Sequence, residues 1–384
     1  MIDRDNATAL DAADPLGRWR EEFLIPDPEL IYLDGNSLGR TPKRTVAALH
    51  LLVEQQWAGD LIDSWWEHDW LNLALNVGDE LAPILGASKG EVAVHESTTV
   101  SIFQQVNVAL DLEPNRRVIA IDDADFPTDR YVAEGVARIR GGEVRHGFGD
   151  LEGVDVVLRS LVDYRTAEIA DIDGETRRAA AAGATTIWDL SHAAGVLDLD
   201  LHAAGVELAV GCTYKFLNGG PGSPAFVFVS EKIQKRVTQP VWGWFAQSEQ
   251  FAMERAFDPR PGIGRMLNGT PPVLGLTAAR EGIALTAEAG IAEIAEKAVQ
   301  LTGFGLELAD QFSLETITPR DSARRGGHVA IRHPNAVALH EALGARKIVV
   351  DRRDPDVLRF GLSPLTTRFV DVYDAFLALA NLVK

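Results

Sequence analysis

Positive charge, cysteine and long apolar runs are all scarce in this sequence. Its 384 residues include 37 lysines and arginines against 56 aspartates and glutamates, which gives a formal net charge of −19. Because phosphate groups bind to positive surfaces, this balance argues against a nucleic-acid partner and against an anionic membrane surface. The single cysteine, Cys212, cannot form an intramolecular disulfide, which is typical of a protein in a reducing cytosol.

Targeting and nucleotide-binding signals are also missing. The first residues, Met1 to Thr8, contain no basic stretch followed by an apolar one, so no signal peptide is expected. No apolar run reaches the roughly 18 residues that a membrane-spanning helix needs. There is no glycine-rich phosphate loop. We therefore expect a cytoplasmic protein that acts on a small molecule, with no membrane or nucleic-acid partner and no metal.

Short apolar segments alternate with helical ones through the middle of the chain. Such alternation predicts an α/β fold with a mostly parallel sheet and helices on both of its faces. The strands are expected at residues 92–94, 118–121, 154–158, 185–190, 207–210 and 225–229.

The two ends of the chain differ from this middle part. Residues 1–40 are predicted to form an N-terminal segment, and residues 41–275 the large α/β domain. A one-sided apolar pattern predicts a helix from Thr45 to Gly59. Short strands, the second of them at 348–350, and helices predict a smaller α+β domain over 276–384, joined to the first by a helix near 275–300.

Two ionisable residues follow neighbouring apolar strands. Asp189 ends a β-branched run, and Lys215 follows the next strand, before a glycine-rich turn at 218–222. Open α/β sheets bind ligands at the carboxyl ends of their strands. Either residue alone is more often a cap or a solvated charge. Together they are what pyridoxal phosphate needs, since a lysine forms a Schiff base with its aldehyde and a carboxylate pairs with its ring nitrogen.

The segments around these two residues resemble the kynureninase family. They read Trp-Asp-Leu-Ser-His-Ala-Ala-Gly at 188–195 and Cys-Thr-Tyr-Lys-Phe-Leu-Asn-Gly-Gly-Pro-Gly at 212–222. The resemblance implies the fold of fold-type I, class V-like pyridoxal phosphate enzymes. It also implies hydrolytic cleavage of the Cβ–Cγ bond of L-kynurenine or 3-hydroxykynurenine in tryptophan breakdown. Other segments match in the family's order, at 33–39, 125–131, 162–167, 242–245, 268–272 and 358–364.

The resemblance also implies roles around the cofactor. Lys215 would hold pyridoxal phosphate and then move the substrate's α-proton, and Asp189 would face the ring nitrogen. Tyr214 would either transfer a proton or bind the phosphate. The other cofactor contacts implied are Thr98, Thr99, Phe126, Asp129, Ser160 and His192.

A second set of implied residues binds the substrate. Arg359 would grip the α-carboxylate, because guanidinium binds carboxylate through two parallel hydrogen bonds. Its alternating apolar neighbours make Arg359 the inward-facing arginine, rather than Arg352 or Arg353. The other substrate contacts implied are Asn36, Ser37 and Trp65, the last against the aromatic ring.

A homodimer with shared active sites is expected by the same resemblance. Trp244 lies in an aromatic segment that suits an interface, and Thr270 lies in a Gly-Thr-Pro-Pro turn. Both would reach the cofactor of the neighbouring subunit.

Other activities of the same fold are alternatives to this one. A cysteine desulfurase needs a cysteine on a mobile loop, which Cys212 cannot supply from a strand end three residues before Lys215. An aminotransferase shares every cofactor contact and stays open on first principles. A protein that kept the fold but lost the chemistry is disfavoured by Lys215, Asp189 and Arg359.

Overall fold

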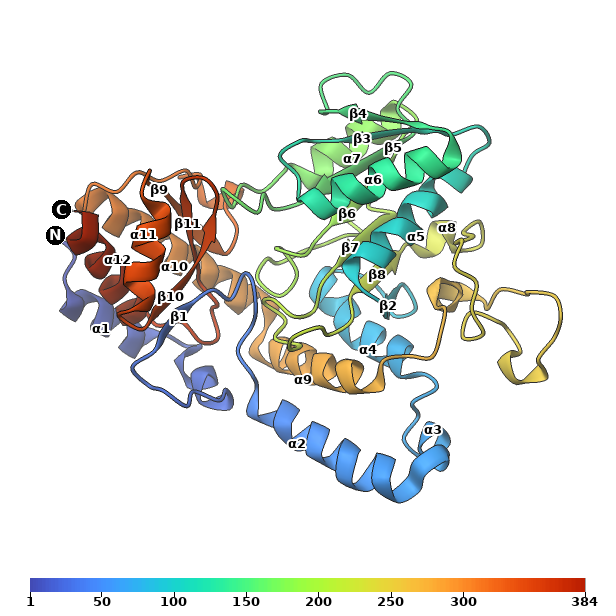
Figure 1. Cartoon of the computed structure of the whole chain (residues 1–384), viewed down its shortest axis with the longest axis horizontal. Coiled ribbons are helices and arrows are strands. Elements are labelled where there is room, and N and C mark those ends of the chain that lie inside the picture. The colour runs from blue at the N-terminus through green and yellow to red at the C-terminus, as the bar shows by residue number, and fades with distance from the viewer. Residues whose placement is uncertain (384) are drawn as a thin grey trace.

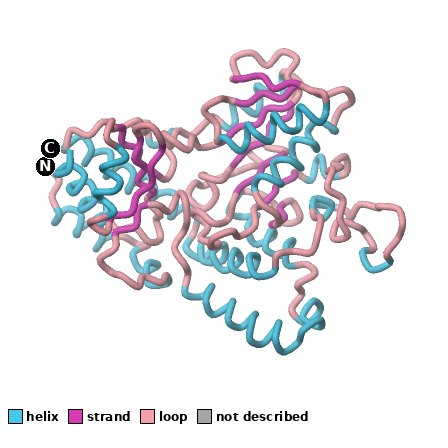
Figure 2. The backbone as a smooth tube through the Cα atoms, viewed as in Figure 1, coloured by secondary structure: helices cyan, strands magenta, loops and turns pink. Residues whose placement is uncertain are grey.

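The computed structural model describes residues 1–383 and shows two bodies built around separate sheets (Figures 1 and 2). Each body has a large hydrophobic cluster of its own, one centred on residues such as Trp188 and Phe226, the other on residues such as Phe360 and Phe376. Separate cores of this kind are typical of two domains. Within residues 1–383, no helix is long and apolar enough to cross a membrane.

The larger body contains a seven-stranded sheet in the order β2-β8-β7-β6-β5-β3-β4. All its strands run parallel except β8, which is antiparallel to both β2 and β7. The predicted α/β fold with a mostly parallel sheet is confirmed. The strands are β2 (Val92–Val94), β3 (Val118–Ile121), β4 (Glu143–His146), β5 (Val156–Ser160), β6 (Thr185–Asp189), β7 (Leu208–Gly211) and β8 (Phe226–Val229).

Helices cover both faces of this sheet, with α5 and α6 in front of it and α7 behind it in Figure 1. Their ends follow from local sequence. Ser97 caps α5 by accepting a hydrogen bond from the Val100 amide, and α6 starts at Pro127 and ends at Gly141, whose φ of 65° suits glycine. The helices of this body are α2 (Lys43–Leu51), α3 (Ser64–Glu67), α4 (Leu73–Leu81), α5 (Thr98–Asp111), α6 (Pro127–Arg140), α7 (Ile172–Ala181), α8 (Glu231–Gln234) and α9 (Val273–Ala289).

The smaller body has a four-stranded sheet in the order β1-β10-β11-β9. The first 40 residues belong to it, because β1 pairs in parallel with β10 and α1 packs against α12. The predicted boundary at residue 275 lies inside α9, and it stays a prediction. The elements are α1 (Arg4–Ala13), β1 (Ile31–Leu33), α10 (Ile291–Gln311), β9 (His328–Arg332), α11 (Ala336–Gly344), β10 (Ile348–Arg353), β11 (Val357–Gly361) and α12 (Phe369–Val383).

The helix expected from Thr45 to Gly59 is not α-helical throughout. The α-helix α2 ends at Leu51, and a π-helical stretch continues from Leu52 to Asp60. Leu61 then leaves it with a φ of 49°, a left-handed conformation that costs energy for a branched side chain. The apolar periodicity located the helical segment but did not show this change of pitch.

Candidate active site

A cavity of about 210 Å³ lies where the carboxyl ends of the large sheet meet the small body. Ser160 and Asp189 are paired residues at the ends of the adjacent strands β5 and β6. The loop after β1 brings in residues of the small body, and the Gly39 amide in that loop donates a hydrogen bond to the Tyr214 carbonyl (2.8 Å). Eleven of the predicted site residues line the cavity: Asn36, Ser37, Thr98, Thr99, Phe126, Asp129, Ser160, Asp189, His192, Tyr214 and Lys215.

Lys215 and His192 are in direct contact on the wall of this cavity. The Lys215 Nζ lies 2.9 Å from the His192 Nε2. Burial, and then the charge of Lys215, hold the pKa of His192 well below its usual value, which favours the neutral ring. The other ring nitrogen, Nδ1, has no hydrogen-bond partner among residues 1–383. His192 therefore fixes the position of the Lys215 amine.

Asp129 and Asp189 also line the cavity, and a third carboxyl group close to them, Asp125, pairs with Arg159 at 3.1 Å. Asp189 accepts a hydrogen bond from the Ser191 amide (2.8 Å), and the Asp129 carboxyl lies 3.4 Å from the Ser160 hydroxyl. Burial first, and then the negative charges of Asp189 and Asp125, raise the pKa of Asp129 well above its usual value. Burial also raises the pKa of Asp125 to about 7. This side of the cavity therefore favours a ligand that carries positive charge or a bound proton.

An aromatic wall and a helix start complete the part of the cavity made by the large body. Phe126 lies at the start of α6, and its ring packs edge-on against Tyr164, with 5.3 Å between centroids. Thr98 and Thr99 form the first turn of α5, where free amide N–H groups and the helix dipole attract anions. The cavity thus offers a flat apolar surface between an acidic side and an anion-binding end.

The small body contributes a buried arginine behind the cavity wall. Arg359 is 0% exposed, and its Nε donates to the Asp351 carboxylate at 2.5 Å. Its Nη2 donates to the Ser37 hydroxyl at 3.2 Å, and its Nη1 donates to the Tyr164 carbonyl at 2.5 Å. Ser37 itself lines the cavity, so Arg359 lies directly behind it.

The comparisons with known proteins fit this geometry. The family model described as "Kynureninase C-terminal domain" matches residues 294–379. The kynureninase of Pseudomonas fluorescens is 40% identical over 400 residues, covering 100% of this chain and 96% of that protein. The kynureninase of Deinococcus radiodurans is 42% identical over 395 residues, covering 99% and 96%. The chain belongs to the kynureninase family. It is therefore an enzyme of the kynureninase type, a hydrolase, and the predicted family is confirmed.

Solved structures with little sequence identity share the fold. A cysteine desulfurase from Thermococcus onnurineus NA1 superposes with a TM-score of 0.81 at 17% identity, covering 95% of this chain and 97% of that one. A C-DES mutant with glycine covalently linked to its pyridoxal phosphate cofactor gives a TM-score of 0.82 at 15% identity, covering 93% and 100%. The fold of the fold-type I enzymes is thereby confirmed. The chemistry of the desulfurase does not transfer, since Cys212 is only 2% exposed.

The residues around the cavity fit pyridoxal phosphate, the cofactor of this enzyme type. The cofactor has an aldehyde, a ring nitrogen that carries a proton and a phosphate. The amine of Lys215 could hold the aldehyde, the buried Asp189 could hold the ring proton, and the first turn of α5 could hold the phosphate. The meeting of Lys215, Asp189 and the first turn of α5 in one cavity is the observation that carries this fit.

Four predicted site residues do not line this cavity. Arg359 lies behind it, as described above. Trp65 and Thr270 line a second, more open and largely apolar cavity of about 600 Å³, together with Trp70 and Pro271. Trp244 is 39% exposed and packs edge-on against Phe245, with 4.7 Å between centroids. The roles predicted for these four residues remain predictions.

Two residues at the substrate end were not among the predicted site residues. Tyr164 and Arg353 both line the cavity, although Arg359 rather than Arg353 was expected to face inward. The signal that could have identified Arg353 is its spacing from Asp351, because residues two apart in a strand share a face of the sheet.

Proposed function

We propose that this enzyme cleaves L-kynurenine hydrolytically between Cβ and Cγ, giving anthranilate and L-alanine, in the cavity between Lys215 and Asp189. 3-Hydroxykynurenine, which gives 3-hydroxyanthranilate, is the alternative substrate. The observation that carries the proposal is the meeting of Lys215, Asp189 and His192 in one cavity of a chain that matches kynureninases along its whole length. The single cysteine supports a cytoplasmic location.

The cofactor end of the site controls the electrons of the reaction. Pyridoxal phosphate, when bound, supplies an electron sink for bonds at the substrate's α-carbon. Asp189 holds the proton on the ring nitrogen, which keeps that sink effective. Phe126 would cover the ring, Thr98 and Thr99 would bind the phosphate, and Ser160, whose hydroxyl lies beside Asp129, would be a further cofactor contact.

Two side chains that are adjacent in sequence carry the proton steps. The Lys215 amine, positioned by His192, takes the α-proton of the substrate. Burial raises the pKa of Tyr214, so its hydroxyl stays protonated at neutral pH. Tyr214 can then donate that proton to the γ-oxygen as water adds there, or it can hydrogen-bond the phosphate.

The substrate end fixes the orientation of the amino acid. Arg359 attracts the α-carboxylate, with Ser37 and Asn36 at the cavity wall in front of it. A fixed carboxylate determines which bond at the α-carbon is held in the reactive orientation.

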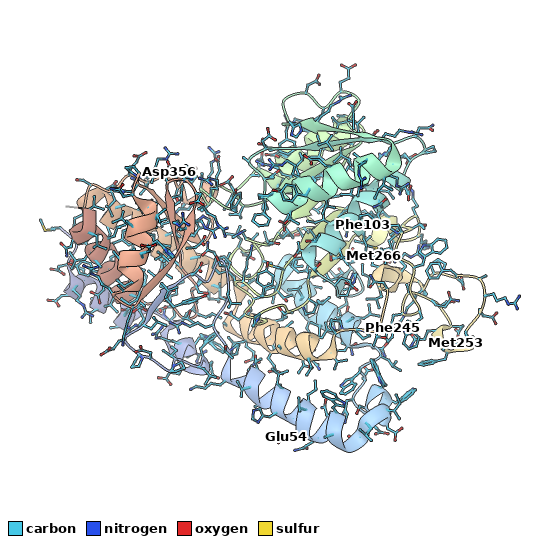
Figure 3. The ribbon with its side chains drawn as sticks, viewed as in Figure 1. Glu54, Phe103, Phe245, Met253, Met266 and Asp356 are labelled. Carbon is cyan, nitrogen blue, oxygen red and sulfur yellow. The ribbon has the colours of Figure 1, made fainter. Side chains whose placement is uncertain are left out.

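The enzyme works as a homodimer in this proposal. Large apolar side chains are exposed beside the second cavity, with Trp57 at 54%, Leu61 at 62% and Ile62 at 66% exposure, and such patches mark protein interfaces. The loop that carries Met253 projects away from the sheets in Figure 3. We expect Trp65 to face the aromatic ring of the substrate, and Trp244 and Thr270 to reach the partner's cavity.

Product analysis tests the reaction. The purified enzyme, loaded with pyridoxal phosphate and given L-kynurenine, should release fluorescent anthranilate and equimolar L-alanine, and Lys215→Ala should release neither. The alternative activity is an aminotransferase, which shares the cofactor contacts. Transfer of the amino group to a keto acid without anthranilate would establish that activity instead.

Subunit mixing tests the shared site. An inactive Lys215→Ala chain is mixed with an inactive Trp244→Ala/Thr270→Ala chain under conditions of proven subunit exchange. If Trp244 and Thr270 act across the interface, hybrid dimers regain one complete site and measurable activity. Exchange without any recovery would place both residues in the site of their own subunit.

A further inference from the structure

A carboxylate shared by two arginines lies beside the active-site cavity. In the small sheet Asp351 on β10 is directly opposite Arg359 on β11. Asp351 and Arg353 are two residues apart on the same strand, so their side chains share a face, while Arg352 points to the other face and pairs with Asp354. The Asp351 Oδ2 lies 2.5 Å from the Arg359 Nε and 2.9 Å from the Arg353 Nε.

Most hydrogen-bond donors of Arg359 are already occupied by the protein. Its Nε donates to Asp351, its Nη2 faces Asp351 and Ser37, and its Nη1 donates to the Tyr164 carbonyl. Within residues 1–383, only one hydrogen on each of Nη1 and Nη2 makes no hydrogen bond, and Nη2 lies against the Asp351 carboxylate. A bidentate grip on a substrate carboxylate needs two parallel N–H groups. In this arrangement Arg359 supplies the charge but not both donors.

Arg353 has the donors that Arg359 lacks. It lines the cavity, and none of its nitrogens donates a hydrogen bond to any group in the described part of the chain. Its Nε is enclosed and lies close to Asp351, but it is not aligned for a hydrogen bond. Its guanidinium carbon lies 5.8 Å from the centre of the Tyr164 ring, and that ring packs against Phe126. An aromatic wall therefore holds Arg353 close to the expected cofactor position.

The charges in this cluster also favour an anion at the cavity. Two guanidinium groups share the single carboxylate of Asp351, and the side chain of Asp351 is only 18% exposed. Asp34, the other nearby carboxyl group, makes no hydrogen bond to either arginine, although its hydroxyl neighbour Ser37 does. The charge of Asp34 acts on both arginines only at longer range, so the N–H groups of Arg353 at the cavity are the donors left for an anion.

We propose that Arg353 is a second substrate-binding residue, which holds the α-carboxylate together with Arg359, and that Asp351 is the positioning residue that keeps the two guanidinium groups side by side. This inference rests on the proposed function only in requiring an α-amino acid as ligand. It makes Arg353 a determinant of specificity, because the site then distinguishes an amino acid from an amine of similar size. A neutral group in place of the carboxylate would leave the donors of Arg353 unpaired.

The decisive experiment compares two ligands that differ only in the carboxylate. L-Alanine and ethylamine are titrated into the enzyme loaded with pyridoxal phosphate, and binding is followed by the visible spectrum of the cofactor. Arg353→Gln should weaken L-alanine binding about tenfold, the effect of losing one charge-assisted hydrogen-bonded contact, and leave ethylamine binding unchanged. Arg352→Gln, on the opposite face of the same strand, should change neither.

Two results would overturn the role of Arg353. One is L-alanine binding to Arg353→Gln that equals binding to the unsubstituted enzyme. The other is an equal loss for both ligands, which would mean that the residue maintains the cavity rather than contacting the carboxylate. Because L-alanine binding needs no bond cleavage, an enzyme that failed to cleave kynurenine could still pass this test, so the two proposals fail separately.

A double substitution tests the positioning role of Asp351. Asp351→Asn should weaken L-alanine binding selectively, and Asp351→Glu should restore part of it. Because Asp351 also contacts Arg359, the double variant Asp351→Asn/Arg353→Gln should bind L-alanine more weakly than Arg353→Gln, but by less than the two single losses combined. Fully additive losses would show that Asp351 does not act through Arg353.

Discussion

The two ends of the active-site cavity are built in different ways. At the cofactor end, Ser160 and Asp189 end two neighbouring strands of the mostly parallel sheet, and Lys215 follows the next strand. At the substrate end, Arg353 and Arg359 come from an antiparallel hairpin, and Ser37 comes from a loop more than 300 residues earlier in the chain. The cofactor end thus depends on local strand ends, whereas the substrate end depends on long-range packing. Substitutions at the two ends should therefore leave different kinetic signatures.

The largest effect is expected at Lys215. Lys215→Ala should abolish turnover, because no other amine lines the cavity in the described part of the chain. It should bind pyridoxal phosphate without a covalent link, so borohydride treatment followed by peptide mapping should label the unsubstituted enzyme at Lys215 and leave the variant unlabelled. Lys232→Ala, on the short helix α8, is the matched control. This variant should still be labelled at Lys215 and keep its activity. Labelling at Lys232 or Lys235 in the unsubstituted enzyme would contradict the assignment.

The two cavity carboxylates should differ in importance. Asp189→Asn removes the charge that holds the ring proton, and we expect a loss of about 10²–10³-fold in kcat/KM. Asp129→Asn should cost about fivefold, the value of one hydrogen bond. The reason is that the raised pKa of Asp129 favours its neutral form, which an amide resembles. Equal losses in kcat/KM for the two variants would show that Asp129 and Asp189 both hold the ring proton.

A substitution at the substrate end should act mainly on KM. Arg359→Leu should raise KM about tenfold or more, because it removes a charge-assisted contact with the substrate, while the visible spectrum of the bound cofactor stays unchanged. Such a result would show that the two ends of the cavity have different kinetic roles, because Asp189→Asn should change the cofactor spectrum as well as kcat. Unchanged kinetics in Arg359→Leu would move the main carboxylate contact to Arg353.

The same difference explains how much of the site could be predicted from the sequence. Asp189 and Lys215 each follow an apolar run, so strand ends located them without knowledge of the tertiary fold. Arg353 was missed because the strand was expected only over 348–350, whereas β10 continues to Arg353. Without a strand predicted through Arg353, the sequence could not show which face of the sheet the side chains of Arg352 and Arg353 point to.

Elements stabilised by distant contacts were also hard to predict. β4 (Glu143–His146) is mostly exposed and polar, and only its parallel pairing with β3 at the sheet edge defines it. β1 is a strand because it pairs with β10, so residues 1–40 belong to the small body through contacts that local periodicity does not show. The buried strands of the large sheet were predictable because their apolar character is continuous along the chain.

The smallest expected effect concerns the stability of the substrate end at different pH values. Burial raises the pKa of Asp34 to about 6 from an unfolded value of 3.8. The folded protein therefore binds the proton more tightly than the unfolded chain, so this group lowers stability as pH rises from about 4 to about 6. Asp34→Asn removes this dependence, and the melting temperature of the variant should fall less than that of the unsubstituted enzyme over this interval, by a few degrees.

The control is Glu254→Gln, which removes an exposed carboxyl group on the protruding loop. This variant should melt like the unsubstituted enzyme at each pH. If Asp34→Asn and Glu254→Gln gave the same profile, Asp34 would titrate normally in the folded protein, and the substrate end would be more hydrated than its packing indicates.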